Sequence, residues 1–116
     1  MTEADLAQAL RKRLYYNAPT VHLVAVPNGG KRTLWAARQA KKEGLASGFP
    51  DLVALWPARG VAFIELKLPK GKVSDNQTEW LARLDYMGHD SAVCRSVDEA
   101  VAFLRKCGAP VMERAV

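Results

Sequence analysis

Residues 48–67 read GFPDLVALWPARGVAFIELK, and this stretch decides the expected fold. Two short apolar runs, 51–56 and 61–66, flank a connection that contains proline and glycine, a pattern typical of a β-hairpin. Asp51 opens the first run and Glu65 lies near the end of the second, where a charged side chain is costly to bury without a partner. The pattern therefore predicts a hairpin at the centre of a sheet, with two carboxylates, Asp51 and Glu65, that need a counter-charge.

The rest of the chain carries clear signals for the helices and strands that would cover this hairpin. Thr2 with Asp5, and Ser74 with Gln77, have the spacing of capping boxes, which mark helix starts. We predict an α/β fold with a central mixed sheet of about four strands flanked by helices in the order α-β-α-β-β-α-β-α. Residues 1–116 are expected to form a single domain, with a loose tail over 109–116. The expected outer elements are helices at 2–16, 33–43, 74–87 and from 96 onward, and strands at 20–26 and 91–95.

The composition excludes several classes of protein. A chain of 116 residues with 49% hydrophobic and 25% charged residues suits one globular domain rather than a disordered or fibrous chain. No apolar run approaches the roughly 20 residues of a membrane span, and the acidic N-terminus lacks a secretion signal. The two cysteines, Cys94 and Cys107, form no disulfide framework. We therefore expect a cytoplasmic protein that is not secreted.

The net charge of +5 is unevenly distributed along the chain. A small basic domain of this kind can bind nucleic acid, an anionic membrane or another acidic partner, whereas a solvated helix face and loop would explain the same charges without any ligand. The candidate phosphate-binding residues lie in two groups, one from 31 to 42 and one directly after Glu65: Lys31, Arg32, Arg38, Lys41 and Lys42, and then Lys70 and Lys72.

Strand parity brings the ionisable residues of the hairpin together if its connection has an odd number of residues, such as 57–59. Asp51 would then lie opposite Glu65, with Lys67 on the same face. Two carboxylates that close repel unless a cation lies between them, and Mg²⁺ prefers oxygen ligands such as these and the Leu66 backbone carbonyl. The plain alternative is a surface ion pair between Glu65 and Lys67, with Asp51 as a turn residue.

Several segments together resemble the VRR-NUC (virus-type replication-repair nuclease) domain of the PD-(D/E)XK nuclease superfamily. They are residues 27–31, 44–51, 63–67 and 77–80. The resemblance covers nearly the whole chain. The chain is therefore similar to the stand-alone domains of some phage and bacterial members. The resemblance implies a restriction-endonuclease-like fold, with Mg²⁺ or Mn²⁺ bound at Asp51 and Glu65 and with Lys67 as the catalytic lysine.

Two further site residues follow from the same resemblance. An acidic residue of the first helix often joins the metal site in this superfamily, and Glu3 is the better match, with Asp5 as the other choice. The family pattern also suggests an active-site glutamine at Gln77. The capping box explains the same residue structurally, and we expect that one side chain cannot easily do both.

We therefore expect a metal-dependent DNA nuclease that hydrolyses phosphodiester bonds. The resemblance suggests structured DNA, such as flaps or four-way (Holliday) junctions, in replication, repair or recombination. Cutting a four-way junction needs two symmetric sites and so implies a homodimer. The alternatives are a basic nucleic-acid-binding module that does not cut and a scaffold that binds an acidic protein partner.

Overall fold

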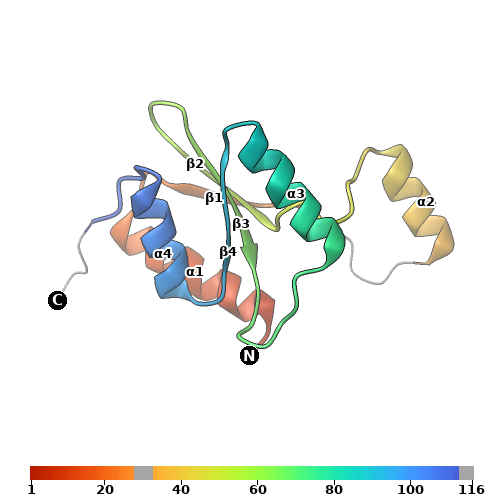
Figure 1. The fold of residues 1–116 in the computed structure, drawn as a ribbon. Helices are drawn as coiled ribbons and strands as arrows, with labels where there is room; N and C mark the ends of the chain where they lie inside the picture. Colours follow the sequence, from red (N-terminus) through yellow and green to blue (C-terminus); the bar gives the residue numbers. More distant parts are fainter. Residues whose placement is uncertain (28–32, 113–116) are drawn as a thin grey trace.

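The computed structural model describes residues 1–27 and 33–112. Helices and strands alternate in the expected order, which is confirmed (Figure 1). Thr2 and Ser74 begin their helices with complete capping boxes, and Thr33 and Ser96 cap the other two. The elements are α1 (Glu3–Asn17), β1 (His22–Ala25), α2 (Leu34–Lys42), β2 (Leu52–Trp56), β3 (Gly60–Leu66), α3 (Asp75–Tyr86), β4 (Asp90–Cys94) and α4 (Val97–Lys106).

The four strands form one mixed sheet in the order β1-β2-β3-β4. The first two neighbouring pairs are antiparallel, and β4 runs parallel to β3. A parallel pair needs a crossover, and α3 supplies it. Because β3 and β4 point the same way, the residues that follow both strands meet at one end of the sheet.

The hydrophobic core lies between the sheet and the helix pair α1 and α4, which lie side by side on one face (Figure 1). Leu6, Leu10 and Leu14 recur every fourth residue and are all buried, as the pattern in α1 predicts. The inward-facing residues of the hairpin alternate with outward ones, as strand geometry requires. The inward set is Leu52, Ala54, Ala62, Ile64 and Leu66.

The other face of the hairpin lies under α3 and holds aromatic rings. Phe49 contacts Phe63 and Trp80 edge to face, with ring centroids 5.7 and 5.1 Å apart. Trp80 therefore has a packing role, and Leu84 is the buried residue of α3. Met87 follows the last turn of α3 and is 56% exposed.

The hairpin has the odd connection on which the predicted register depends. Trp56 pairs with Gly60 and Val53 pairs with Phe63, so residues 57–59 form a three-residue tip. Ala58 and Arg59 both have positive φ, at 64° and 68°, a conformation that costs energy for residues with a Cβ. The tight tip is thus built at some backbone cost, and it sets the pairing of every residue down to the far end.

Two hydrogen bonds involve the backbone of residue 112: the Met112 N–H donates to the Asn17 carbonyl at 2.7 Å, and Arg105 Nη2 donates to the Met112 carbonyl at 2.8 Å. These contacts join residue 112 to α1 and α4, whereas looseness of the tail over 109–116 stays a prediction, and residues 113–116 lie outside the described part.

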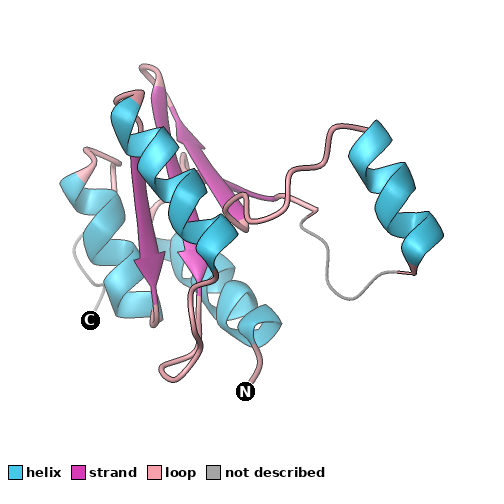
Figure 2. Ribbon diagram, turned by 45° about the vertical axis from the view of Figure 1, so that its right-hand side comes forward, coloured by secondary structure: helices cyan, strands magenta, loops and turns pink. Residues whose placement is uncertain are grey.

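Helix α2 stands apart from the sheet and the other helices (Figure 2). Its only buried residue is Ala40, and Leu34 and Trp35 near its start are 69% and 71% exposed. No helix in residues 1–27 and 33–112 is long and apolar enough to cross a bilayer.

Candidate active site

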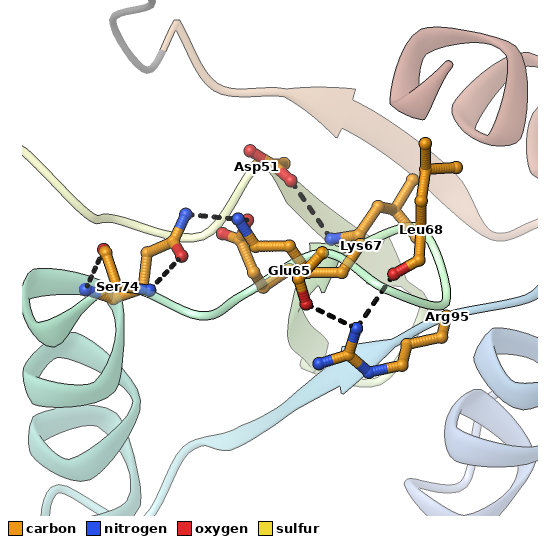
Figure 3. A network of polar contacts seen from close by, with 9 residues as sticks. Asp51, Glu65, Lys67, Leu68, Ser74 and Arg95 are labelled. Carbon is orange, nitrogen blue, oxygen red and sulfur yellow. Dashed lines mark hydrogen bonds and ion pairs between the residues drawn. The ribbon is translucent and has the colours of Figure 1, made fainter. Parts of the chain in front are cut away.

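The candidate active site lies at the end of the sheet where β2 begins and β3 ends. Asp51 directly precedes β2, and the register of the hairpin, continued by one residue, places it opposite Glu65. The Leu66 N–H donates to Asp51 Oδ2 at 3.0 Å, so the Asp51 carboxylate turns toward the end of β3 (Figure 3). The predicted convergence of Asp51 and Glu65 on one face is therefore present in the structure.

Glu65 is almost completely buried, with 1% of its surface exposed. Its Oε2 accepts from Gln77 Nε2 at 3.0 Å and lies 3.8 Å from Lys67 Nζ (Figure 3). Its Oε1 has no hydrogen-bond partner among the described residues. A buried carboxylate oxygen without a partner is costly, so Glu65 Oε1 is a position where a cation or a further donor would be favourable.

The protonation of Glu65 reflects its burial and its charged neighbours. The pKa of Glu65 is raised to about 8, and burial of the carboxyl group is the largest cause. The charge of Asp51 and a side-chain hydrogen bond with it raise the pKa further, the charge of Lys67 lowers it, and Glu3 adds a smaller rise. The single positive charge of Lys67, whose Nζ lies 3.8 Å from Glu65 Oε2, is thus too small to offset the charges of two neighbouring carboxylates. A cation between Asp51 and Glu65 would remove this conflict.

Gln77 takes part in both the helix cap and the site. Its Oε1 accepts from the Ser74 N–H at 2.9 Å, which completes the capping box, while its Nε2 donates to Glu65 Oε2. The expectation that one side chain cannot easily do both is wrong, because the amide has an acceptor at one end and donors at the other. The first turn of α3 therefore aims an N–H at the buried carboxylate.

The residues fit a hard divalent cation by the chemistry of their donors. Asp51 and Glu65 supply carboxylate oxygens, one of them unpartnered, and Leu66, whose N–H donates to Asp51, directly follows Glu65 in the chain. Across the described ranges, no three His, Cys, Asp or Glu side chains are close enough to hold one ion. The protein would therefore contribute two carboxylates and a backbone carbonyl, leaving the remaining positions to water and substrate.

The two acidic residues of α1 are placed differently. Asp5 accepts from the Thr2 N–H at 2.8 Å and is engaged in the helix cap. Glu3 lines a hollow of about 330 Å³ together with Asp51 and Leu66. Of the two, Glu3 is the one that lines this hollow.

The candidate phosphate-binding residues divide by position. Lys70 and Lys72 are exposed in the loop that follows Lys67. Arg38, Lys41 and Lys42 are exposed on α2, away from the sheet, and Lys31 and Arg32 lie outside the described residues.

One residue at this end of the sheet is absent from the sequence-based set. Arg95 follows β4 and donates to backbone carbonyls of the loop after Lys67 (Figure 3). No local pattern marks it, because its partners lie 24 to 27 residues earlier in the chain.

Comparisons with known proteins identify the family of the chain and its fold. Residues 2–98 match the family model described as the VRR-NUC domain. A solved structure described as a VRR_NUC domain protein has a TM-score of 0.68 at 17% identity, over 90% of this chain and 86% of its own. Another, described as a VRR_NUC domain, has a TM-score of 0.63 at 17% identity, over 89% and 94%. No curated protein matches the sequence. From the family match, with the shared fold beside it, the chain belongs to the VRR-NUC domain family of nucleases.

Proposed function

We propose that the protein is a Mg²⁺- or Mn²⁺-dependent deoxyribonuclease that hydrolyses phosphodiester bonds in structured DNA, such as flaps or four-way junctions, in replication, repair or recombination. The observation that carries the proposal is the pairing of Asp51 with the buried Glu65, whose Oε1 has no partner among the described residues. Such a pair is costly in an empty site and favourable around a cation.

Asp51, Glu65 and the Leu66 carbonyl would hold the ion. When bound, a divalent cation supplies a Lewis acid for the phosphoryl oxygens and lowers the pKa of a bound water. Gln77 keeps Glu65 in place through the 3.0 Å hydrogen bond from Nε2. Glu3, which lines a hollow together with Asp51 and Leu66, is the candidate for an additional ligand that would bind the ion through water.

Lys67 is the remaining catalytic candidate. Its side chain is only 12% exposed and its ammonium group lies 3.8 Å from Glu65 Oε2, so its position is restricted. A positive group held there would orient the attacking water and offset charge that develops on the phosphate. Its restricted position would let it act without a large loss of side-chain freedom.

DNA would be held through its phosphates by Lys70 and Lys72 near the site and by Arg38, Lys41 and Lys42 on α2; Lys31 and Arg32 complete the proposed set. These contacts carry no base sequence information, which suits an enzyme that recognises the shape of a branch.

Cleavage of a four-way junction would require a homodimer with two symmetric sites. Exposed apolar side chains on α2 and at the end of α3 offer surface for it: Leu34, Trp35, Tyr86 and Met87. Sedimentation with and without a junction substrate measures the oligomeric state directly.

The decisive experiment incubates the protein with labelled flapped, four-way, single-stranded and double-stranded DNA in Mg²⁺, Mn²⁺ or EDTA. We expect cleavage that EDTA abolishes. Asp51→Asn should lose cleavage and still bind DNA in EDTA, because it removes a proposed ligand charge and no phosphate contact. Asp98→Asn is the matched control, since Asp98 is exposed and pairs only with Arg13 among the described residues. A wild-type protein that binds these DNAs and cuts none of them in either metal would instead be a non-catalytic binding module.

A further inference from the structure

The segment after Lys67 is a short basic loop, residues 67–73, that leaves the active-site end of β3. The Gly71 N–H donates to the Leu68 carbonyl at 2.9 Å, which closes a tight turn with Pro69 and Lys70 at its centre. The exposed side chains of Lys70 and Lys72 project from this loop. A loop that presents two like charges repels itself and needs something to hold it.

Arg95 holds this turn from the neighbouring strand. Its Nη1 donates to the Leu68 carbonyl at 2.8 Å and to the Gly71 carbonyl at 2.7 Å, with the Pro69 carbonyl at 3.3 Å (Figure 3). Hydrogen bonds from a charged donor are stronger than those between neutral groups. Within the described residues no carboxylate forms an ion pair with Arg95, so its charge is directed to these carbonyl oxygens.

The turn over residues 68–71 lies close to the side chain of Lys67. A Cβ added to Gly71 would lie 3.5 Å from Lys67 Cδ and 3.3 Å from the Leu68 carbonyl oxygen, so the Lys67 side chain passes close to the turn at Gly71. The backbone of Lys67 is held to β4, because its N–H donates to the Cys94 carbonyl at 3.1 Å. Lys67 is thus joined to β4 through its backbone and lies beside a turn that Arg95, at the end of β4, supports.

We propose that Arg95 is a positioning residue: it fixes the 67–73 turn against the Lys67 stem and so sets the place of the Lys67 ammonium group beside Glu65. This inference rests on the proposed function of Lys67 for its effect on catalysis, although the effect on the turn stands without it. Arg95 needs no contact with DNA or metal in this role. Its effect on rate should therefore exceed its effect on DNA affinity.

The test compares Arg95→Gln, which removes the charge, with Arg95→Lys, which keeps it but loses the planar guanidinium. Arg105→Gln is the matched control, because Arg105 also donates to a backbone carbonyl, that of Met112, away from the site. We expect both Arg95 variants to lower the single-turnover cleavage rate at saturating DNA, by up to about a hundredfold for Arg95→Gln, as for a displaced catalytic group. Arg95→Lys should recover only part of this rate, and Arg105→Gln should match wild type.

A second measurement does not depend on cleavage. Hydrogen exchange of the Gly71 amide should speed up in both Arg95 variants and stay unchanged in Arg105→Gln, because the turn opens more often without its clamp. If Gly71 exchange and the cleavage rate of Arg95→Lys both equal wild type, Arg95 contributes only charge and the inference is overturned. If wild type cuts no DNA while Gly71 exchange responds as expected, the clamp stands and the nuclease proposal fails.

Discussion

Replacing Glu65 with glutamine should make the metal-free protein more stable at alkaline pH. In the folded protein, burial and the neighbouring Asp51 raise the pKa of Glu65 from 4.5 to about 8. Between these values the folded protein holds a proton that the unfolded chain has released. The folded state therefore binds more protons, and the free energy of unfolding falls as pH rises through this window. Glutamine has the size of the protonated side chain and no proton to lose.

The size of the effect follows from the same two values. The interval from 4.5 to about 8, at about 1.4 kcal/mol for each pH unit, sets a ceiling of about 5 kcal/mol. Glu65 is almost wholly buried, so solvent screening reduces this little, whereas rearrangement around the charged form will reduce it. We expect wild type and Glu65→Gln to be similar at about pH 5 and to differ by several kcal/mol at about pH 9. That difference is a large part of the stability of an ordinary small domain.

Urea unfolding in EDTA, followed by circular dichroism across this pH range, measures the effect. Glu79→Gln is the control, because Glu79 is exposed on α3 and undergoes the same chemical change. Adding Mg²⁺ at alkaline pH should stabilise wild type and not Glu65→Gln, since a bound cation offsets the buried charge. A gap between wild type and Glu65→Gln that stays constant from acid to alkaline pH would refute the reasoning.

Three further perturbations test other parts of the site. Gln77→Ala leaves the Ser74 cap in place but removes the reciprocal half of the α3 capping box and the donor to Glu65; we expect a loss of about 1 kcal/mol in urea unfolding together with slower cleavage, and unchanged stability would show that these two hydrogen bonds contribute nothing. Lys70→Ala and Lys72→Ala should each weaken DNA binding equally across sequences and reduce the slope of log affinity against log salt by about 1; a salt-independent or sequence-dependent loss would exclude phosphate contact. Gly48→Ala should destabilise by more than about 1 kcal/mol, because Gly48 has a φ of +86° and an added Cβ would lie 2.5 Å from the Asn76 carbonyl carbon; a thermal melt equal to wild type would contradict this.

The hairpin and the helix starts could be predicted because their signals are local. Parity along two adjacent strands, with an odd connection between them, is enough to bring Asp51 opposite Glu65. Capping patterns at Thr2 and Ser74 depend on residues three positions apart and therefore survive in the folded protein. Where a short pattern has one physical solution, the sequence is sufficient.

The contacts between distant segments could not be read in this way. Gln77 has two chemically different ends, and only the docking of α3 over the hairpin shows that both are used. Arg95 finds its partners across a β-α-β crossover, so nothing next to it in the chain indicates a clamp. Similarly, the sequence pattern of α2 predicts a helix but does not indicate what the helix packs against. In the structure, Leu34 and Trp35 of this helix are largely exposed.

The three-residue tip at 57–59 has a consequence for how this protein can evolve. A residue inserted or deleted at the tip is tolerated only if the turn itself absorbs it, because a slip of the pairing by one residue would move Asp51 to the opposite face from Glu65, although the tip is at the far end of the hairpin. Homologous hairpins that differ in tip length should therefore keep the pairing of Val53 with Phe63, or carry a compensating bulge nearer the carboxylates. The pairing register, rather than the identity of the tip residues, is the heritable constraint that preserves the site.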